Sequence, residues 1–200
     1  MIEYQRSGRN KDVTINQTYI ASGEFRNKFD KIVSNKYISR ILFGKAKEML
    51  FHRTGTKYED MYWIDADTGD VIASVLDSVT EEEIIYNSSV VKKLNRCGNI
   101  IAMHTHPNSM PPSIPDFNSM YEHKYIIGIV VCHDGKVFTY SSKEEVRESL
   151  FDLMIAEYYN NHYNEKVKDI HKFEYQAQLF VLNEIRKSYD ISFEEVGYHG

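Results

Sequence analysis

The chain has 200 residues, of which 42% are hydrophobic and 26% charged, and its formal net charge is −5. This length and composition suit one soluble globular domain, or one domain with a helical extension. The sequence has no stretch dense in Lys and Arg, so sequence-independent binding to nucleic acid is not favoured.

The sequence also bears on where the protein works. It contains no run of about 18 apolar residues, the length that a membrane-spanning helix needs. Residues 1–17 carry charges where a signal peptide needs an apolar stretch. The two cysteines, Cys97 and Cys132, are too few for a disulfide-stapled scaffold. These features predict a cytoplasmic protein whose cysteines are small, reduced core side chains.

The first predicted elements are mostly helical. Residues 1–34 are polar and mixed, with weak strand character at Val13–Ile15 and a short helix around Glu24–Phe29. A longer helix is predicted over Asn35–Phe51, where apolar residues recur at helical spacing. Gly55 is expected to end it, because glycine readily adopts the left-handed conformation of a helix C-terminus.

Two β-hairpins are predicted farther along the chain. The first joins Met61–Asp65 to Val71–Leu76, and the second joins Tyr125–Cys132 to Lys136–Tyr140. In each case two β-prone runs flank a short turn in which an Asp is followed within two residues by a Gly. That combination is typical of hairpins.

Between the hairpins the sequence predicts a helix, a strand and a second helix. Thr80 and Glu83 form a capping-box pattern, which predicts a helix that reaches about Leu94. Asn99–His104 is a short apolar strand. A proline-dense loop follows it, and the next helix is predicted over Ile114–Glu122.

The chain from Ser142 onward is predicted to be helical, over Lys143–Tyr163 and Glu165–Ser188. The sequence thus divides into an N-terminal segment (1–34), a central domain (35–141) and a C-terminal helical extension (142–200). The order of the elements suits an α/β or α+β sandwich with a central sheet. The C-terminal helices are candidates for binding a partner, completing the core or forming a homodimer.

The strongest chemical signal lies between His104 and Asp116, where all four prolines of the chain are found. His104 and His106 stand two residues apart at the end of the predicted strand, so their side chains point to the same face. Asp116 falls near the first turn of the next helix, where the helix dipole favours a carboxylate. Two histidines and one carboxylate leave one position open on a metal ion, as is typical of catalytic zinc, Zn²⁺.

A catalytic zinc site also needs a carboxylate that takes a proton from water. Glu48 lies in a helix beside two lysines, where a surface ion pair is expected. The run Glu81–Glu83 is expected in the exposed first turn of a helix. Glu59 instead stands just before the strand Met61–Asp65, at a strand edge from which it can approach the histidines. Glu59 is therefore the predicted general base.

Ser113 precedes Asp116 by three residues and occupies the predicted N-cap of the helix. There its hydroxyl can accept a backbone N–H, a contact worth about 1 kcal/mol. It can alternatively donate to the attacking water or to the oxyanion that follows. Because one hydroxyl cannot serve every partner at once, both roles stay open.

The pattern His-x-His-Pro, a short loop and Pro-Ser-x-x-Asp resembles the motif of the JAMM (MPN-plus, JAB) zinc metalloproteases, and the chain looks like a bacterial-type member. This resemblance implies that His104, His106 and Asp116 bind Zn²⁺. It also implies that Glu59 is the acid–base residue and that Ser113 supports the oxyanion.

The resemblance covers residues 35 to 140 and implies a cytidine-deaminase-like MPN/JAB sandwich, in which helices flank a central mixed β-sheet. One difference is the loop between His106 and Ser113, which has six residues where the family usually has seven. The implied activity is hydrolysis of a peptide or isopeptide bond in a protein or peptide substrate. Ubiquitin-like proteins are among the candidate substrates.

Two other functions stay open at this point. RadC-like bacterial relatives share a similar motif, which would make the protein nucleic-acid-associated. Its net negative charge disfavours this function. The second is a zinc-bearing protein-interaction module without hydrolytic activity. Such a module would have a fourth protein ligand that closes the metal site.

Overall fold

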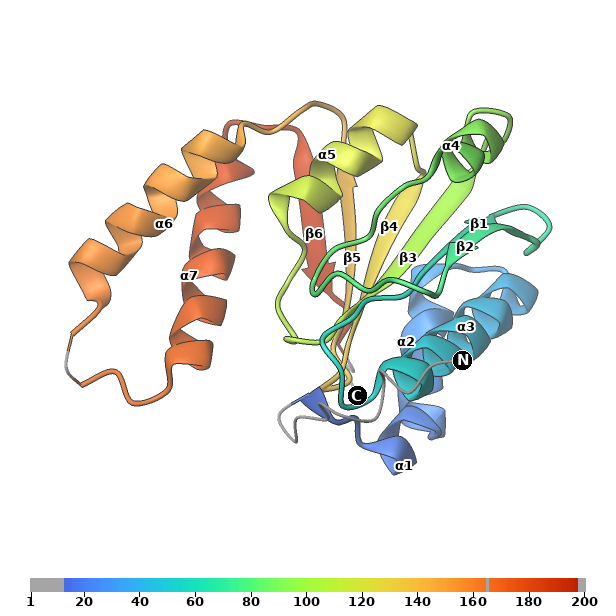
Figure 1. The fold of residues 1–200 in the computed structure, drawn as a ribbon, viewed down its shortest axis with the longest axis horizontal. Coiled ribbons are helices and arrows are strands. Elements are labelled where there is room, and N and C mark those ends of the chain that lie inside the picture. Colours follow the sequence, from blue (N-terminus) through green and yellow to red (C-terminus); the bar gives the residue numbers. More distant parts are fainter. Residues whose placement is uncertain (1–12, 165, 198–200) are drawn as a thin grey trace.

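A computed structural model describes residues 13–164 and 166–197 and places seven helices and six strands in this part of the chain (Figure 1). The helices are α1 (Gln17–Ile20), α2 (Gly23–Ile32), α3 (Lys36–Arg53), α4 (Ser88–Leu94), α5 (Ile114–His123), α6 (Glu148–His162) and α7 (Ile170–Ile185). The strands are β1 (Met61–Asp65), β2 (Val71–Val75), β3 (Ile100–His106), β4 (Ile127–Cys132), β5 (Val137–Ser142) and β6 (Ile191–Glu195). The architecture is mixed α/β, in agreement with the predicted class.

All six strands belong to one sheet, in the order β2-β1-β3-β4-β5-β6. The sheet is mixed because β3 and β4 run in parallel, whereas the other neighbours are antiparallel. A parallel pair needs a crossover connection, and here α5 lies within that connection. The carboxyl end of β3 is therefore followed by the loop that leads to the start of α5, and this junction carries the His-x-His segment and Asp116.

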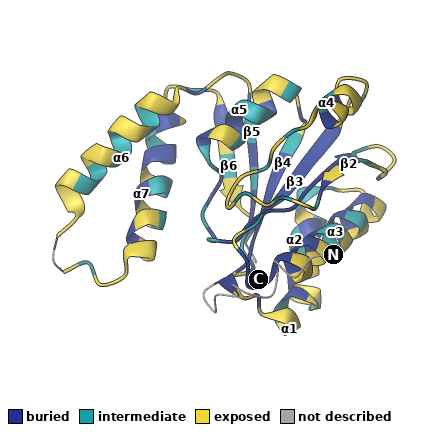
Figure 2. Ribbon diagram, in the orientation of Figure 1, coloured by how far each residue is buried: buried dark blue, intermediate teal, exposed yellow. Residues whose placement is uncertain are grey.

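Helices cover both faces of the sheet, whose four central strands are largely buried (Figure 2). Side chains alternate between the two faces along each strand. On one face, Tyr62 and Met103 pack in a core with residues of α2 and α3. On the other, Trp63, Ala102 and Phe138 pack with residues of α4, α5 and α7. Each large apolar side chain buried in these cores contributes about 1.5–3 kcal/mol relative to exposure.

Several elements form where the sequence predicts them. Helix α3 begins after Asn35, whose side chain accepts hydrogen bonds from two backbone N–H groups, and it ends just before Gly55. The φ of Gly55 is 76°, in the left-handed region that favours glycine. Both predicted hairpins are present, as the pairs β1–β2 and β4–β5.

The prediction of a helix that begins at Thr80 is wrong in its first half, because α4 begins only at Ser88. The backbone N–H of Glu82 donates to the carbonyl oxygen of Lys57 at 3.0 Å, and Glu82 itself has a φ of 56°. Pairing with a distant segment uses backbone groups that a helix would need for its own hydrogen bonds. The capping box at Thr80 and Glu83 therefore does not form a helix start.

The C-terminal part of the chain is not the purely helical extension that the sequence predicts. Helices α6 and α7 form a hairpin to one side of the sheet (Figure 1), but β6 follows them and pairs with β5. Ser142 is paired with Ile191 in this ladder. The two helices therefore form the connection between β5 and β6, which are neighbours in the sheet. Glu165, the predicted start of the second helix, lies outside the described residues.

The N-terminal segment is tied to the end of α3. Val13–Ile15 is not a strand, in contrast to its predicted character. Instead, the backbone N–H of Ile15 donates to Oγ1 of Thr54 at 3.2 Å, and that of Gly55 donates to the carbonyl oxygen of Val13 at 3.2 Å. The short helix predicted around Glu24–Phe29 is present within α2. Residues 1–12 of the predicted segment lie outside the described residues.

The described helices and the two cysteines bear on the predicted location of the protein. Among the helices that the structure describes, none combines the length and apolar character needed to cross a bilayer. Cys97 and Cys132 are both free thiols, the first partly exposed and the second buried in the core.

Gly128 allows the ring of Tyr140 to lie across β4. The two residues are paired between β4 and β5, and a Cβ added to Gly128 would clash with three atoms of that ring. We expect Gly128→Val to displace the ring and to lower the free energy of unfolding by about 1–3 kcal/mol, the usual cost of overpacking. Urea denaturation measures the change. Gly98→Ala is the control, because its Cβ would meet no atom within 4 Å, and equal stability of the two variants would contradict the prediction.

Candidate metal centre

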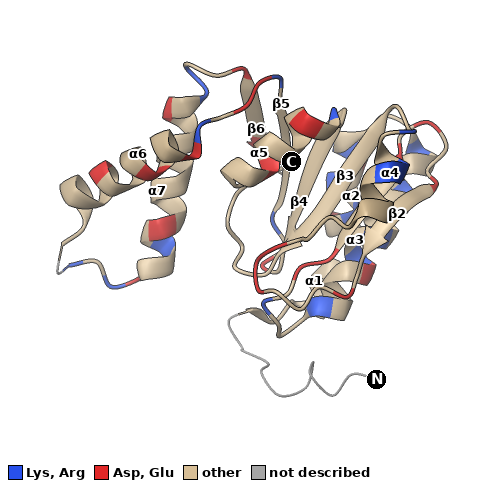
Figure 3. Ribbon diagram, turned by 45° about the horizontal axis from the view of Figure 1, so that its top comes forward, with Lys and Arg blue, Asp and Glu red and all other residues tan. Residues whose placement is uncertain are grey.

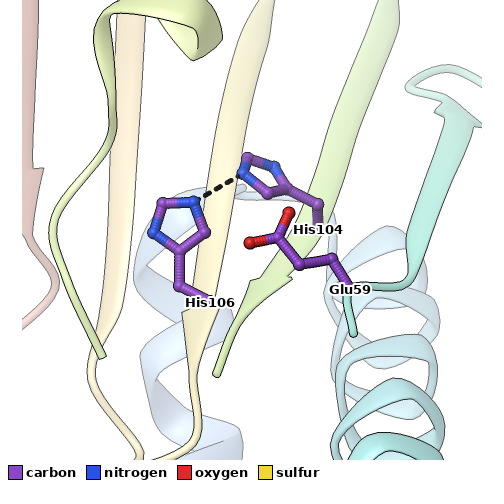
Figure 4. Close-up of side chains that lie close together, drawn as sticks. All are labelled: Glu59, His104 and His106. Atoms are coloured by element: carbon purple, nitrogen blue, oxygen red, sulfur yellow. Dashed lines mark hydrogen bonds between the residues drawn. The ribbon is translucent and has the colours of Figure 1, made fainter. Parts of the chain in front are cut away.

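His104 and His106 lie at the carboxyl end of β3 and are buried, with exposed fractions of 3% and 7%. Because side chains alternate along a strand, they share the face of Ala102, which packs with residues of α5 and α7. The intervening Thr105 points to the opposite face. The strand therefore presents both imidazoles on the same side of the sheet, as predicted, and Figure 4 shows their rings turned toward each other.

The two imidazoles and the Asp116 carboxylate converge on one small volume. Nε2 of His104 lies 3.0 Å from Nε2 of His106. Oδ1 of Asp116 lies 3.1 Å from the first nitrogen, and Oδ2 lies 3.5 Å from the second. In a tetrahedral zinc site with bonds of about 2.0–2.1 Å, ligand atoms stand about 3.3 Å apart. The observed separations lie on either side of this value, so their spacing suits one tetrahedral ion.

Asp116 is held in place by the first turn of α5. Its Oδ2 accepts hydrogen bonds from the backbone N–H and from the hydroxyl of Ser113, at 2.7 Å and 2.8 Å. Its backbone N–H donates in return to Oγ of Ser113 at 3.4 Å, which completes a capping box. The hydroxyl of Ser113 is therefore engaged as an N-cap, the first of the two roles open to it.

Glu59 lies across from His106. Met61 of β1 is paired with His104 of β3, and continuing this antiparallel register by two residues sets Glu59 opposite His106. Its carboxylate points toward the imidazoles (Figure 4), and one oxygen lies within 4.8 Å of a nitrogen of each ring. Glu59, His104 and His106 thus form a buried group close enough to hold a metal ion.

Burial also changes the acidity of Glu59. Its exposed fraction is 6%, and loss of hydration disfavours its charged form. This burial raises the pKa of Glu59, although the nearby His106 and His104 act in the opposite direction. A carboxyl group with a raised pKa beside a candidate metal position suits proton transfer.

The two imidazoles differ in the contacts of their second nitrogen, Nδ1. Nδ1 of His106 lies 2.9 Å from the carbonyl oxygen of Met110, and we assign it a proton because a carbonyl oxygen can only accept. This contact leaves Nε2 of His106 facing Asp116, in the way that an outer hydrogen bond orients a metal-ligating histidine. Nδ1 of His104 is buried without a hydrogen-bond partner among the described residues.

The electrostatics of the site favour a positive charge at its centre. Burial lowers the pKa of His106, but the hydrogen bond with Asp116 and the charges of Glu59 and Asp116 outweigh this and raise it to about 9. Burial acts to raise the pKa of Asp116, but the two histidines hold it well below its usual range. In the absence of a metal ion, a proton on His106 therefore balances the carboxylates.

Metal binding should consequently release protons. His106, with a pKa of about 9, is protonated at neutral pH, whereas Zn²⁺ needs a deprotonated imidazole nitrogen. We expect about one proton to be released per Zn²⁺ at neutral pH, and the apparent affinity to rise about tenfold per pH unit until His106 is deprotonated. Isothermal titration calorimetry in buffers of different ionisation enthalpy measures both quantities. An affinity independent of pH across the neutral range would contradict this prediction.

The residue after Glu59 anchors this part of the site. The buried side chain of Asp60 lies 2.5 Å from Nε of Arg53, within an ion pair. The backbone N–H of Asp60 donates to Oγ1 of Thr105 at 3.0 Å, and its carbonyl oxygen accepts from the Thr105 N–H at 3.1 Å. Because Thr105 stands between the two histidines in sequence, these bonds fix the position of Glu59 relative to both rings.

The candidate metal centre opens into a cleft of about 680 Å³. The five residues predicted for the site all line it: Glu59, His104, His106, Ser113 and Asp116. Phe151, Ile155 and Tyr159 of α6 also line it. The structure therefore brings the five predicted residues together in a cleft to which the C-terminal hairpin contributes part of the lining.

Glu82 and Glu83 also line the cleft, which the sequence analysis missed. Their place after Thr80 predicts an exposed helix start, whereas the non-helical segment that carries them borders the cleft. Oε2 of Glu82 accepts a hydrogen bond of 3.2 Å from Nδ2 of Asn108, which links this segment to the proline-dense loop. The run of glutamates was visible in the sequence, but nothing in its spacing indicated this placement.

No protein-family model, curated protein or solved structure matches the chain. The chemical interpretation of the site therefore rests on its residues and their geometry.

Proposed function

We propose that this protein is a zinc-dependent hydrolase that cleaves a peptide or isopeptide bond in a protein or peptide substrate. The observation that carries the proposal is that two imidazoles in an open cleft stand beside the Asp116 carboxylate and within 4.8 Å of the Glu59 carboxylate. Two imidazoles and one carboxylate form a donor set that suits Zn²⁺ and leaves a position free for substrate or water. The remaining carboxylate is available for acid–base chemistry.

In this proposal His104, His106 and Asp116 hold the metal. When bound there, Zn²⁺ would polarise the scissile carbonyl and lower the pKa of water. Glu59 takes a proton from the attacking water and delivers it to the leaving amine, and its raised pKa makes its carboxylate a stronger base for the first of these transfers. These roles are those that the resemblance to JAMM metalloproteases implies.

Ser113 has two roles in the proposed reaction. Its capping box keeps the Asp116 carboxylate directed at the two histidines. Ser113 also borders the cleft, where its hydroxyl can support the oxyanion if it leaves Asp116 during the reaction.

A second candidate function is a metal-stabilised interaction module, because Glu59 is near enough to the histidines to act as a further protein ligand. A metal ion enclosed by four protein groups is typical of a structural site. The cleft in front of the site favours the hydrolase, since a structural metal needs no access for substrate.

Metal analysis and a crystal structure using zinc anomalous scattering test the proposal. We expect one Zn²⁺ per chain on His104, His106 and Asp116, with Glu59 facing its free position. We also expect a panel of peptides to be cleaved, and cleavage to stop when a chelator removes the metal. Coordination by Glu59 together with no cleavage of any peptide would assign the site to the second candidate.

A further inference from the structure

One wall of the cleft is an apolar stripe on α6. Phe151, Ile155 and Tyr159 stand four residues apart, so they follow one another along a single helix face, and all three line the cleft. All residues of α6 are described, and none of them is buried. Phe151 and Ile155 also pack against the core, and the ring of Tyr159 contacts that of Phe173, so the three side chains are half-buried. The part of each that faces the cleft is what a bound molecule would meet.

The helical hairpin that carries the stripe is fastened to the proline-dense loop. Nε2 of Gln178 in α7 donates to the carbonyl oxygens of Pro111 and Pro112, both at 3.0 Å. Nε2 of His171 lies 2.5 Å from the carbonyl oxygen of Asn108. Since the same loop connects His106 to Asp116, these bonds set the wall at a defined place beside the candidate metal centre.

The charged side chains around this wall are acidic. Glu82 and Glu83 from the segment before α4, and Glu174 from α7, line the cleft. A neighbouring cavity of about 250 Å³ shares part of the hairpin wall and adds Glu148 and Asp152. No Lys or Arg is among the described residues that line these two cavities. Acidic positions on α6, on α7 and before α4 are visible in Figure 3.

Carboxylates beside an apolar stripe match the chemistry of a Lys or Arg side chain. The aliphatic stem of such a side chain packs on apolar surface while its cation reaches a carboxylate. Charges of one sign that line a cleft also raise the local concentration of a molecule of opposite charge. An acidic segment would be repelled by the same surface.

We propose that the cleft selects a basic polypeptide segment. A Lys or Arg side chain lies along the stripe of Phe151, Ile155 and Tyr159. Its cation lies near the carboxylates of Glu82, Glu83 and Glu174. This inference rests on the proposed function, because it names the substrate class of the same site, and it makes the α6–α7 hairpin the specificity-determining wall.

Binding to the full-length chain, kept metal-free with a chelator so that no cleavage occurs, tests the inference. Three fluorescein-labelled peptides share one Ala, Gly and Leu framework and carry either two Lys, two norleucine or two Glu residues. By fluorescence anisotropy we expect the Lys peptide to bind about tenfold more tightly than the norleucine peptide, and the Glu peptide to bind most weakly. The preference for Lys should shrink as salt is added, because salt screens exposed charges.

Single substitutions then locate the recognition. We expect Glu82→Gln, Glu83→Gln and Glu174→Gln each to weaken binding of the Lys peptide about threefold, as for partly exposed ion pairs. The matched control is Glu157→Gln, since Glu157 is exposed on α6 but does not line the cleft. This control should leave binding of all three peptides unchanged.

Equal binding of the three peptides would overturn the inference, as would an effect of Glu157→Gln equal to that of Glu174→Gln. Cleavage by the zinc-loaded chain separates this inference from the proposed function. Hydrolysis of all three peptides at one rate, without selective binding, would support the hydrolase and overturn the basic preference. Selective binding of the Lys peptide without cleavage of any peptide would support the binding surface and count against the hydrolase.

Discussion

Glu59→Gln is expected to keep Zn²⁺ and to lower kcat for peptide hydrolysis by about 10²–10⁴-fold, the usual contribution of a general base. Glutamine has nearly the shape of glutamate but cannot accept the proton from water. The proposed ligands His104, His106 and Asp116 are unchanged in this variant, and the buried position of residue 59 remains filled. Measurement of kcat together with the zinc content of the same sample separates loss of chemistry from loss of metal.

Glu48→Gln is the matched control for this variant. Glu48 is also a glutamate near β1, where it accepts hydrogen bonds from Lys45 and from the hydroxyl of Tyr62, but it does not line the cleft. We expect its substitution to leave kcat and zinc content unchanged. Full activity of zinc-loaded Glu59→Gln would show that Glu59 is not the general base. Loss of zinc from that variant would identify Glu59 as a ligand.

Arg53→Met is expected to lower the free energy of unfolding by about 3–5 kcal/mol. The side chains of Arg53 and Asp60 have exposed fractions of 2% and 0%, so the substitution removes the guanidinium from a buried carboxylate and leaves it only the imidazole of His52, whose Nδ1 lies 2.6 Å from Oδ2. It also removes the hydrogen bond of 2.9 Å from Nη2 of Arg53 to the carbonyl oxygen of Leu76. Urea denaturation followed by the fluorescence of Trp63, which is buried in the core, measures the loss.

The contrast with an exposed ion pair makes this prediction specific. Arg40 pairs with Asp30 at 2.9 Å, but the Arg40 side chain is 45% exposed. We expect Arg40→Met to lower stability by less than about 1 kcal/mol, because water and salt screen exposed pairs. A loss in Arg53→Met no larger than that in Arg40→Met would show that the buried pair contributes little to folding.

The sequence predicts the convergence of His104, His106 and Asp116 because local rules place all three. Alternation along a strand directs both histidines to one face, and the N-terminal turn of the following helix holds the carboxylate. Glu59 is farther away in sequence, yet its place immediately before β1 makes its approach to β3 predictable once those strands are neighbours. The position of the site therefore follows from short stretches of chain.

The surroundings of the site depend on contacts between distant segments, which a local pattern does not contain. Thr80 and Glu83 satisfy the rule for a helix start, but Glu82 pairs its backbone with Lys57 instead. Ile191–Glu195 forms a strand because β5 offers it an edge. Neither outcome can be derived from propensity alone, since tertiary pairing overrides weak local preferences.

The connectivity of the α6–α7 hairpin bears on how the protein can evolve. Since Ser142 and Ile191 are paired neighbours, the hairpin is an insertion between two adjacent strands, and its length can change without altering the order of the sheet. Its two helices differ in their tolerance of change. Val181, Leu182 and Ile185 of α7 belong to the core, whereas no residue of α6 is buried. Mutations in α6 can therefore alter what the cleft accepts at less cost to folding than mutations in α7, and leave the residues proposed for the chemistry untouched.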